Sequence, residues 1–151
     1  QKVFVPYANP HVWGGGRRPG PTRLVVTAHT DVGLVGYGET LCLLEFTEPV
    51  MVRTIIPIAI GLDPHGVEHP YRKVDGARFY HQKRAMVFAL AAVEMACWDL
   101  IGQAAGAPLH KLCGGKYRER IEMLAYLFAS DPKRSALRPG TLSTAGSVRS
   151  S

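Results

Sequence analysis

The sequence predicts an α+β fold in which a three-stranded antiparallel meander is followed by a helical bundle. Three short segments with alternating or β-branched side chains lie within the first 40 residues. A turn sequence, Asp31-Val-Gly33, joins the second segment to the third. The second half of the chain then holds a long stretch with apolar residues at helical spacing. A meander can bury one face beneath helices, so a two-layer domain is expected.

The three predicted strands surround a loop rich in glycine and proline. We expect the first strand over residues 2–7 and the second, RLVVTAHT, over residues 23–30. The third strand, LVGYGE, is expected over residues 34–39. Residues 9–22 contain three consecutive glycines and three prolines, which predicts a loop between the first two strands.

Two helices are predicted directly after the strands. Thr47 is expected to cap a helix that starts at Glu48 and runs to Gly61, and Pro57 should kink this helix or end its regular part early. The sequence Asp63-Pro64 repeats the pattern of a cap followed by proline and predicts the start of a further short helix.

The strongest helical pattern covers residues 78–105. Gly106 is placed to end this helix, Pro108 prevents its continuation, and one further turn is expected over residues 109–112. Spacings of three and four residues put one apolar stripe on the helix, formed by Met86, Leu90, Val93, Cys97, Leu100 and Ala104.

Two acids on this long helix, Glu94 and Asp99, stand five residues apart and about 140° around the axis. This arrangement is poor for a shared metal, so we expect them to cap, to pair with cations or to anchor the domain to a neighbour. Trp98 is expected to pack between domains. The six histidines are scattered along the chain, and we expect no metal site within it.

The last part of the chain departs from this pattern. Residues 121–128, IEMLAYLF, are almost continuously apolar, which is typical of a strand buried on both faces in a parallel sheet or barrel. We expect a domain over residues 1–116, a barrel-type strand over 117–128, and a Ser/Arg-rich disordered tail over 129–151.

Composition excludes some classes of partner. Residues 131–151 hold four basic residues and one acid, which accounts for half of the net charge of +6. Since no basic stripe with interleaved aromatics appears, no nucleic-acid partner is expected. No run approaches 18 uninterrupted apolar residues, so no membrane span is expected. Three cysteines without a CxxC pair, Cys42, Cys97 and Cys113, predict buried reduced thiols in a cytoplasmic protein; the alternative is a disulfide or a metal role.

The segment ALAAVEMACWDLIGQAAGAPLHKLCGG, residues 89–115, resembles the signature of the mandelate racemase/muconate lactonizing group of the enolase superfamily. The resemblance extends to TDVGLVGYGE at residues 30–39 and to GLDP at residues 61–64, and it spans about residues 2–128. Cys97 and Cys113 stand where the family more often has an aliphatic residue.

The resemblance implies an enolase-type N-terminal capping domain packed over a (β/α) barrel. In such enzymes the barrel carries a Lys or His base that removes a proton next to a carboxylate, and Mg²⁺ stabilises the resulting enediolate. The resemblance implies carboxylic acid substrates, with sugar-acid dehydration, racemisation and cycloisomerisation all represented in the group, and a sugar-acid dehydratase or a racemase is expected here. The full-length enzyme is expected to be a homo-oligomer.

The catalytic residues of the family cannot be carried over to this chain. A barrel needs about 200 residues, and 23 residues follow Phe128. We therefore expect a truncated or frameshifted coding sequence whose product binds no Mg²⁺ itself and is inactive alone. The alternative is a non-catalytic binding or regulatory module that pairs with an intact homologue. An uncovered apolar strand at residues 121–128 would promote aggregation of such a module, which favours the enzyme fragment.

The loop between the first two strands matches the position of the family's mobile specificity loop. Trp13 would offer an apolar wall, and His11, Arg17 and Arg18 would meet a carboxylate or hydroxyl groups of the substrate. Glycines 14–16 would let the loop open and close. The alternative is a solvated loop whose charges have no function.

Overall fold

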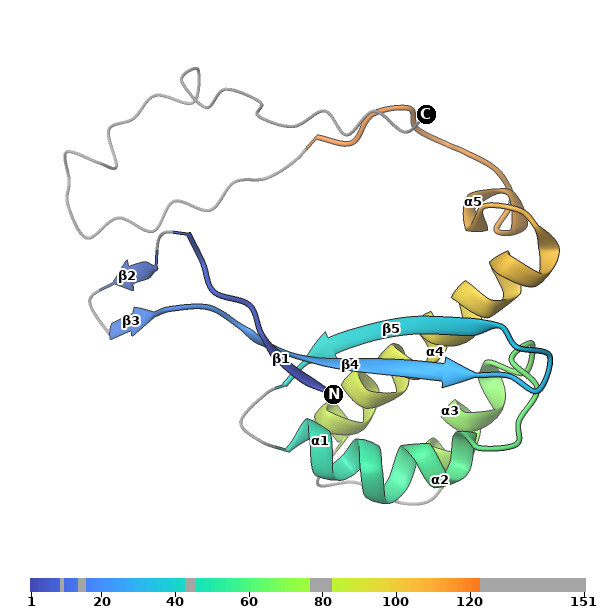
Figure 1. The fold of residues 1–151 in the computed structure, drawn as a ribbon, viewed down its shortest axis with the longest axis horizontal. Coiled ribbons are helices and arrows are strands. Elements are labelled where there is room, and N and C mark those ends of the chain that lie inside the picture. Colours follow the sequence, from blue (N-terminus) through green and yellow to red (C-terminus); the bar gives the residue numbers. More distant parts are fainter. Residues whose placement is uncertain (9, 14–15, 43–45, 77–82, 123–151) are drawn as a thin grey trace.

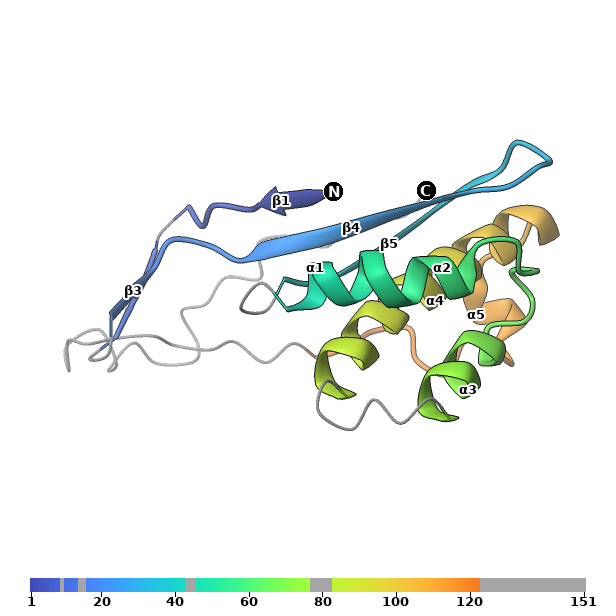
Figure 2. The same cartoon turned by 90° about the horizontal axis from the view of Figure 1, so that it is seen from below.

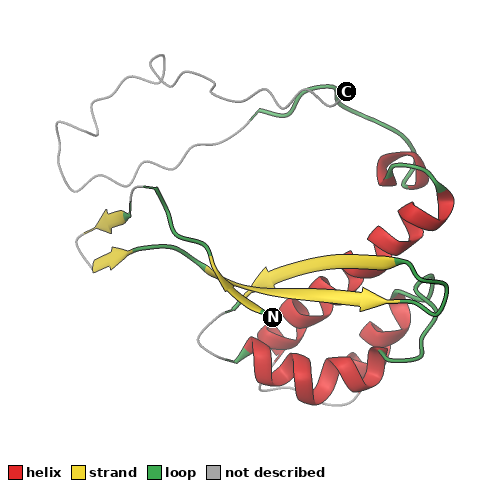
Figure 3. Cartoon of the chain, viewed as in Figure 1, coloured by secondary structure: helices red, strands yellow, loops and turns green. Residues whose placement is uncertain are grey.

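The computed structural model describes residues 1–8, 10–13, 16–42, 46–76 and 83–122. It has two layers, a three-stranded antiparallel sheet and a layer of helices that covers one face of it (Figures 1 and 2). The sheet has the order β1-β4-β5, with β1 at Lys2–Phe4, β4 at Thr22–His29 and β5 at Val35–Leu41. The predicted α+β class, with strands first and helices after, is confirmed (Figure 3).

The two faces of the sheet follow from the two-residue period of a strand. On β5, Gly36, Gly38 and Thr40 are buried, whereas Tyr37 and Glu39 between them are exposed. On β4 the buried residue Leu24 lies opposite Thr40 and therefore belongs to the same helix-facing side.

The first helical segment differs from its prediction. It begins at Thr47 rather than after it, and the Thr47 side chain makes no capping hydrogen bond. Helix α1 (Thr47–Val50) passes into a π-helical turn (Met51–Ile55) and then into α2 (Ile56–Ala59). The Ile56 N–H donates to the Met51 carbonyl, five residues back. This π turn ends just before Pro57, which has no N–H to continue the normal pattern, so the predicted irregularity at the proline is present.

The predicted helix start at Asp63-Pro64 is wrong. The Asp63 carboxylate instead accepts a hydrogen bond of 2.9 Å from the backbone N–H of His65, and the Gly66 N–H donates to the Asp63 carbonyl at 2.9 Å. Aspartate forms such turns with the residue two positions on as readily as it caps a helix. The next helix, α3, spans Glu68–Gly76.

Helix α4 (Lys83–Ala105) is the central element, and its predicted apolar stripe is largely confirmed. Met86, Leu90, Val93 and Leu100 are buried, Cys97 is half-buried, and Ala104 is exposed. Gly106 adopts φ +57°, its N–H bonds the Gln103 carbonyl, and the Ala107 N–H bonds the Gly102 carbonyl. These bonds form a Schellman cap, as predicted. The expected extra turn is helix α5 (Leu109–Leu112).

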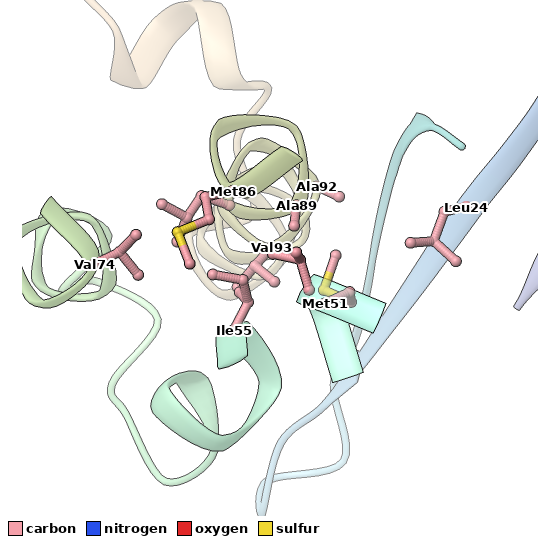
Figure 4. Close-up of a cluster of buried hydrophobic side chains, with 10 residues drawn as sticks. Leu24, Met51, Ile55, Val74, Met86, Ala89, Ala92 and Val93 are labelled. Carbon is pink, nitrogen blue, oxygen red and sulfur yellow. The ribbon is translucent and has the colours of Figure 1, made fainter. Parts of the chain in front are cut away.

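The core lies where α4 meets the first helical segment, α3 and the sheet (Figure 4). Ile55 and Ala89 are fully buried, and Met86 is 2% exposed. Met86 faces Val74 of α3 on one side of α4, while Met51 lies between α4 and the sheet residue Leu24. Each large side chain buried in this way contributes about 1.5–3 kcal/mol.

Helix α4 crosses β5 at backbone contact. A Cβ atom added at Gly36 would overlap the Ala96 carbonyl, and one added at Gly38 would overlap the Ala92 carbonyl. Glycine at these two positions therefore permits the closest approach of helix to strand.

The stretch Arg84–Ala105 is long and apolar enough, by length and composition alone, to cross a membrane. A buried core helix meets the same criteria, and the contact with β5 accounts for its composition.

Polar side chains of α4 also bond the outer edge of β5. The Asp99 carboxylate accepts the Tyr37 N–H at 2.9 Å, and the Gln103 amide donates to the Val35 carbonyl at 2.8 Å. Both backbone groups point away from β4, so they would otherwise form an open strand edge. Asp99 therefore bonds the edge of a strand, a role that was not among those predicted for it, and its contact with a barrel stays a prediction.

The three cysteines match their prediction only in part. The cysteines are unpaired, but Cys113 is exposed, whereas Cys42 and Cys97 are half-buried. The prediction that all three are buried is therefore wrong for Cys113, which follows the short helix α5.

Ile121 is exposed at the end of the described chain. Residues 123–128 of the predicted strand, together with the predicted tail over 129–151, lie outside the described residues.

Candidate functional site: the ribbon beyond the sheet

The segment predicted as a loop is the distal end of a two-stranded ribbon. Beyond β1, the Val5 N–H donates to the Pro21 carbonyl at 3.0 Å and the Tyr7 N–H to the Pro19 carbonyl at 2.8 Å. The ribbon then ends in an antiparallel hairpin of β2 (His11–Trp13) and β3 (Gly16–Arg18). Figure 2 shows β3 projecting beyond the helical layer. The predicted loop over residues 9–22 therefore contains two paired strands, at His11–Trp13 and Gly16–Arg18, which were not predicted from the sequence.

Proline and glycine at the base of the hairpin suit this pairing. Pro19 and Pro21 have no N–H, and each contributes its carbonyl oxygen as an acceptor. Gly20 lies between them, where an added Cβ atom would overlap the Val5 carbonyl. Residues that usually signal a loop therefore allow two strands to lie close together at this point.

The pairing changes register between the ribbon and its tip. Tyr7 bonds Pro19, whereas His11 pairs with Arg18. Three residues separate Tyr7 from His11, but Pro19 follows Arg18 directly. The Tyr7 ring stacks on the His11 ring across this step, with centroids 4.2 Å apart and an angle of 20° between the planes. Both side chains are half-buried, and the stack orients the imidazole.

The hairpin separates the four predicted substrate-contacting residues. His11 lies opposite Arg18, and Val12 lies opposite Arg17. Because alternate strand positions face opposite sides, His11 and Arg18 share one face of the hairpin, and Arg17 belongs to the other. Trp13 pairs with Gly16 at the end of the ribbon. The structure thus brings His11 and Arg18 together but not Arg17.

Sequence reasoning missed Tyr7, which positions His11. An aromatic residue four positions before a histidine was the available signal. The pairing itself was also detectable, since HVW and GRR flank a Gly-Gly pair, a recognised hairpin pattern.

Within the described residues, no group of three His, Cys, Asp or Glu side chains could hold a metal ion. His65 and His69 have the four-residue spacing of a helical zinc pair, but His65 lies in the turn before α3. Its ring nitrogen Nδ1 lies 3.0 Å from the Asp63 carboxylate. The backbone and ring hydrogen bonds from His65 lower the pKa of Asp63. The Asp63 carboxylate and the His65 ring are thus already paired with each other.

Comparison with known families accounts for the fold. Residues 3–114 match the model of the mandelate racemase/muconate lactonizing enzyme N-terminal domain. N-succinyl-L-Arg/Lys racemase of Bacillus cereus is 28% identical over 141 residues, covering 89% of this chain and 37% of the relative. D-mannonate dehydratase of Novosphingobium aromaticivorans is 31% identical over 115 residues, covering 75% and 29%.

Solved structures show the same arrangement. The crystal structure of the Bacillus cereus racemase matches with a TM-score of 0.65 and 28% identity, over 78% of this chain and 32% of that one. Dipeptide epimerase of Enterococcus faecalis, complexed with Mg and a dipeptide, matches with a TM-score of 0.59 and 28% identity, over 76% and 33%. This chain spans about a third of the length of these relatives. It belongs to the mandelate racemase/muconate lactonizing enzyme family, of which it carries the N-terminal capping domain.

Proposed function

We propose that this chain supplies the capping domain of a Mg²⁺-dependent enzyme that removes the proton next to a carboxylate. The reaction is a sugar-acid dehydration or a racemisation, the activities named in two of its relatives. The observation that carries the proposal is the family match over residues 3–114. The described residues lack a metal-binding cluster, so the proposal places the Mg²⁺ ligands and the base in a barrel domain and expects the 151-residue chain to be inactive alone. The three unpaired cysteines support a reducing compartment such as the cytoplasm.

Within this proposal the ribbon of residues 5–21 covers the substrate. It projects away from the helices, and its tip combines His11, Trp13 and Arg18 on a hairpin held by backbone hydrogen bonds. A polar, cationic tip of this kind suits carboxylate and hydroxyl groups.

Proton abstraction can be tested directly. The polypeptide encoded by the whole reading frame, sequenced through and beyond codon 151, is incubated with Mg²⁺ in D₂O with a panel of sugar acids and N-acylated amino acids. Proton NMR should show deuterium entering next to the carboxylate, and EDTA should stop it. The 151-residue chain by itself should give no exchange. Exchange by that chain alone, or none by a polypeptide that includes a barrel, would contradict the proposal.

The second candidate is a non-catalytic module that pairs with an intact homologue. No observation in the described residues favours it over the first. Sedimentation of the 151-residue chain with an intact homologue would detect such a complex.

A further inference from the structure

The side of the sheet that faces away from the helical layer is not covered by any described helix (Figure 2). Its side chains alternate along the strands with the helix-facing residues. Valine, leucine and tyrosine fill more than half of its positions, although a sheet face in contact with water usually carries polar residues. We call this surface the outer face, and it comprises Val3 of β1, Arg23, Val25, Thr27 and His29 of β4, and Val35, Tyr37, Glu39 and Leu41 of β5.

The outer face carries one arginine and one carboxylate among its described side chains. Arg23 and Glu39 lie diagonally across the two long strands, since Arg23 pairs with Leu41 and Glu39 pairs with Val25. The Arg23 Nε atom lies 3.6 Å from the Glu39 Oε2 atom, which is longer than a hydrogen bond. Their side chains are 34% and 49% exposed. Both ions therefore remain accessible to a further partner of opposite charge.

A second copy of this chain supplies that partner by symmetry. When two outer faces meet about a two-fold axis that passes between Arg23 and Glu39, each Arg23 lies over the Glu39 of the other copy. The four charges then alternate in sign, so every ion gains an opposite neighbour. The apolar side chains of the two faces, with Tyr37 at 60% exposure, are removed from water in the same contact.

The charge of the whole chain also favours this surface for contact between copies. The net charge is +6, so two copies repel one another in most orientations. On the outer face the charges of Arg23 and Glu39 cancel. Two copies can therefore approach there with less repulsion than through a surface that carries part of the excess positive charge.

The dimensions of the sheet determine how strong such a contact can be. Strand β4 has eight residues, so it is roughly 26 Å long, and three strands span roughly 14 Å. An interface of this size is small, below about 800 Å² for each partner. It is compatible with a reversible dimer whose dissociation constant is on the order of 10–100 µM.

We propose that the outer face is a self-complementary interface through which two copies of this chain form a two-fold symmetric dimer. Reciprocal pairs between Arg23 of one copy and Glu39 of the other set the orientation. The apolar side chains around them supply most of the binding free energy. This interface does not depend on the proposed catalytic function.

The first test measures the oligomeric state of the 151-residue chain by sedimentation velocity, from about 1 to about 500 µM. The weight-average mass should rise with concentration and level off at two copies. Sodium chloride at about 0.5 M should weaken the association severalfold, because it screens the reciprocal charge pairs. A chain that stays monomeric over this range, or a mass that keeps rising beyond two copies, would overturn the proposal.

The second test exchanges the charges. Arg23→Glu and Glu39→Arg each bring like charges together across the axis, and each should weaken self-association by at least about 20-fold. An equimolar mixture of the two variants should dimerise again, since every ion then faces an opposite charge. The double variant Arg23→Glu/Glu39→Arg should dimerise by itself for the same reason. Two folded single variants that fail to associate when mixed would refute the reciprocal pairing.

The third test separates this interface from general apolar association. Tyr37→Lys places a charge on the outer face and should weaken the dimer by at least about tenfold. The matched control is Val52→Lys, because Val52 is 57% exposed in the π-helical turn of the helical layer. It should leave the dissociation constant unchanged. Equal effects of the two lysine variants would show that the outer face is not the interface.

Discussion

The Asp99 carboxylate of α4 accepts a hydrogen bond from the backbone N–H of Tyr37, 62 residues away in sequence, at 2.9 Å. The bond closes the outer edge of β5, which has no strand neighbour on that side within the described sheet. Together with the Gln103 bond to Val35, it explains why an acid and an amide follow one another at helical spacing on a mainly apolar helix.

Removing this acceptor should destabilise the domain moderately. Asp99→Ala is expected to lower the free energy of unfolding by about 1–2 kcal/mol, because the Tyr37 N–H loses a charged acceptor at a partly exposed site. Asp99→Asn keeps an acceptor oxygen and should cost less. Urea denaturation measures the loss, and amide exchange at Tyr37 should accelerate in Asp99→Ala. Unchanged exchange there would show that the bond is not formed in solution.

Contact between α4 and β5 should make Gly38 intolerant of any side chain. Gly38→Ala would drive a methyl group into the Ala92 carbonyl, and we expect a loss of more than about 3 kcal/mol in stability. Gly102→Ala is the matched control on α4, where an added Cβ would meet its nearest atoms at 3.4 Å. It should be neutral or stabilise by up to about 1 kcal/mol, since alanine favours helix. Similar melting temperatures for both variants would contradict the described contact.

The buried hydroxyl of Thr47 offers a stabilising substitution. The residue is fully buried, and its Oγ1 atom has no hydrogen-bond partner in the described structure. Thr47→Val keeps the shape and removes the unsatisfied oxygen, so the free energy of unfolding should rise by about 1 kcal/mol. Thr47→Ser keeps the oxygen and loses a methyl group, and it should destabilise. A destabilised valine variant would reveal a partner for the hydroxyl.

Thiol reactivity should distinguish two cysteines. Partial burial, and then the negative charge of Glu94, raise the pKa of the Cys97 thiol. A raised pKa leaves less thiolate at pH 8, so iodoacetamide should modify Cys97 more slowly than the exposed Cys113. Glu94→Gln should lower the Cys97 pKa and speed its modification. Mass spectrometry of peptides gives both rates, and the difference should vanish in urea.

Trp13 is expected to form an apolar wall for the substrate. In the polypeptide of the whole reading frame, Trp13→Ala should raise KM by about tenfold, because an aromatic contact with the substrate is lost. The matched control is Val12→Ala at the neighbouring position of β2, on the other face of the hairpin. An unchanged KM in the Trp13 variant would remove this residue from the site.

Local patterns allowed much of the fold to be predicted. The apolar period of α4 and the cap at Gly106 depend on residues close in sequence, and both predictions hold. The turn at Asp63 was misjudged because aspartate before proline suits either a helix start or a turn. The π turn before Pro57 and the bond between Asp99 and Tyr37 depend on contacts that no local pattern contains.

The candidate site was predicted only as a list of residues. Glycine and proline concealed the ribbon, because these residues mark loops on average but here permit close pairing at Gly20. Without the register, the sequence placed Arg17 and Arg18 together. A change of one position reverses the face in a strand, so the distinction between the two arginines depends on the pairing with His11.

The distance in sequence between β5 and the helix that closes its edge determines the order of events during synthesis. β4 and β5 are joined by a short turn and can pair as soon as they leave the ribosome. Their partner α4 ends at Ala105, more than 60 residues later. Throughout that interval the nascent hairpin exposes an edge that another chain could join. Slow translation between residues 42 and 105 would lengthen this exposure, so the yield of folded protein becomes sensitive to codon choice in that stretch.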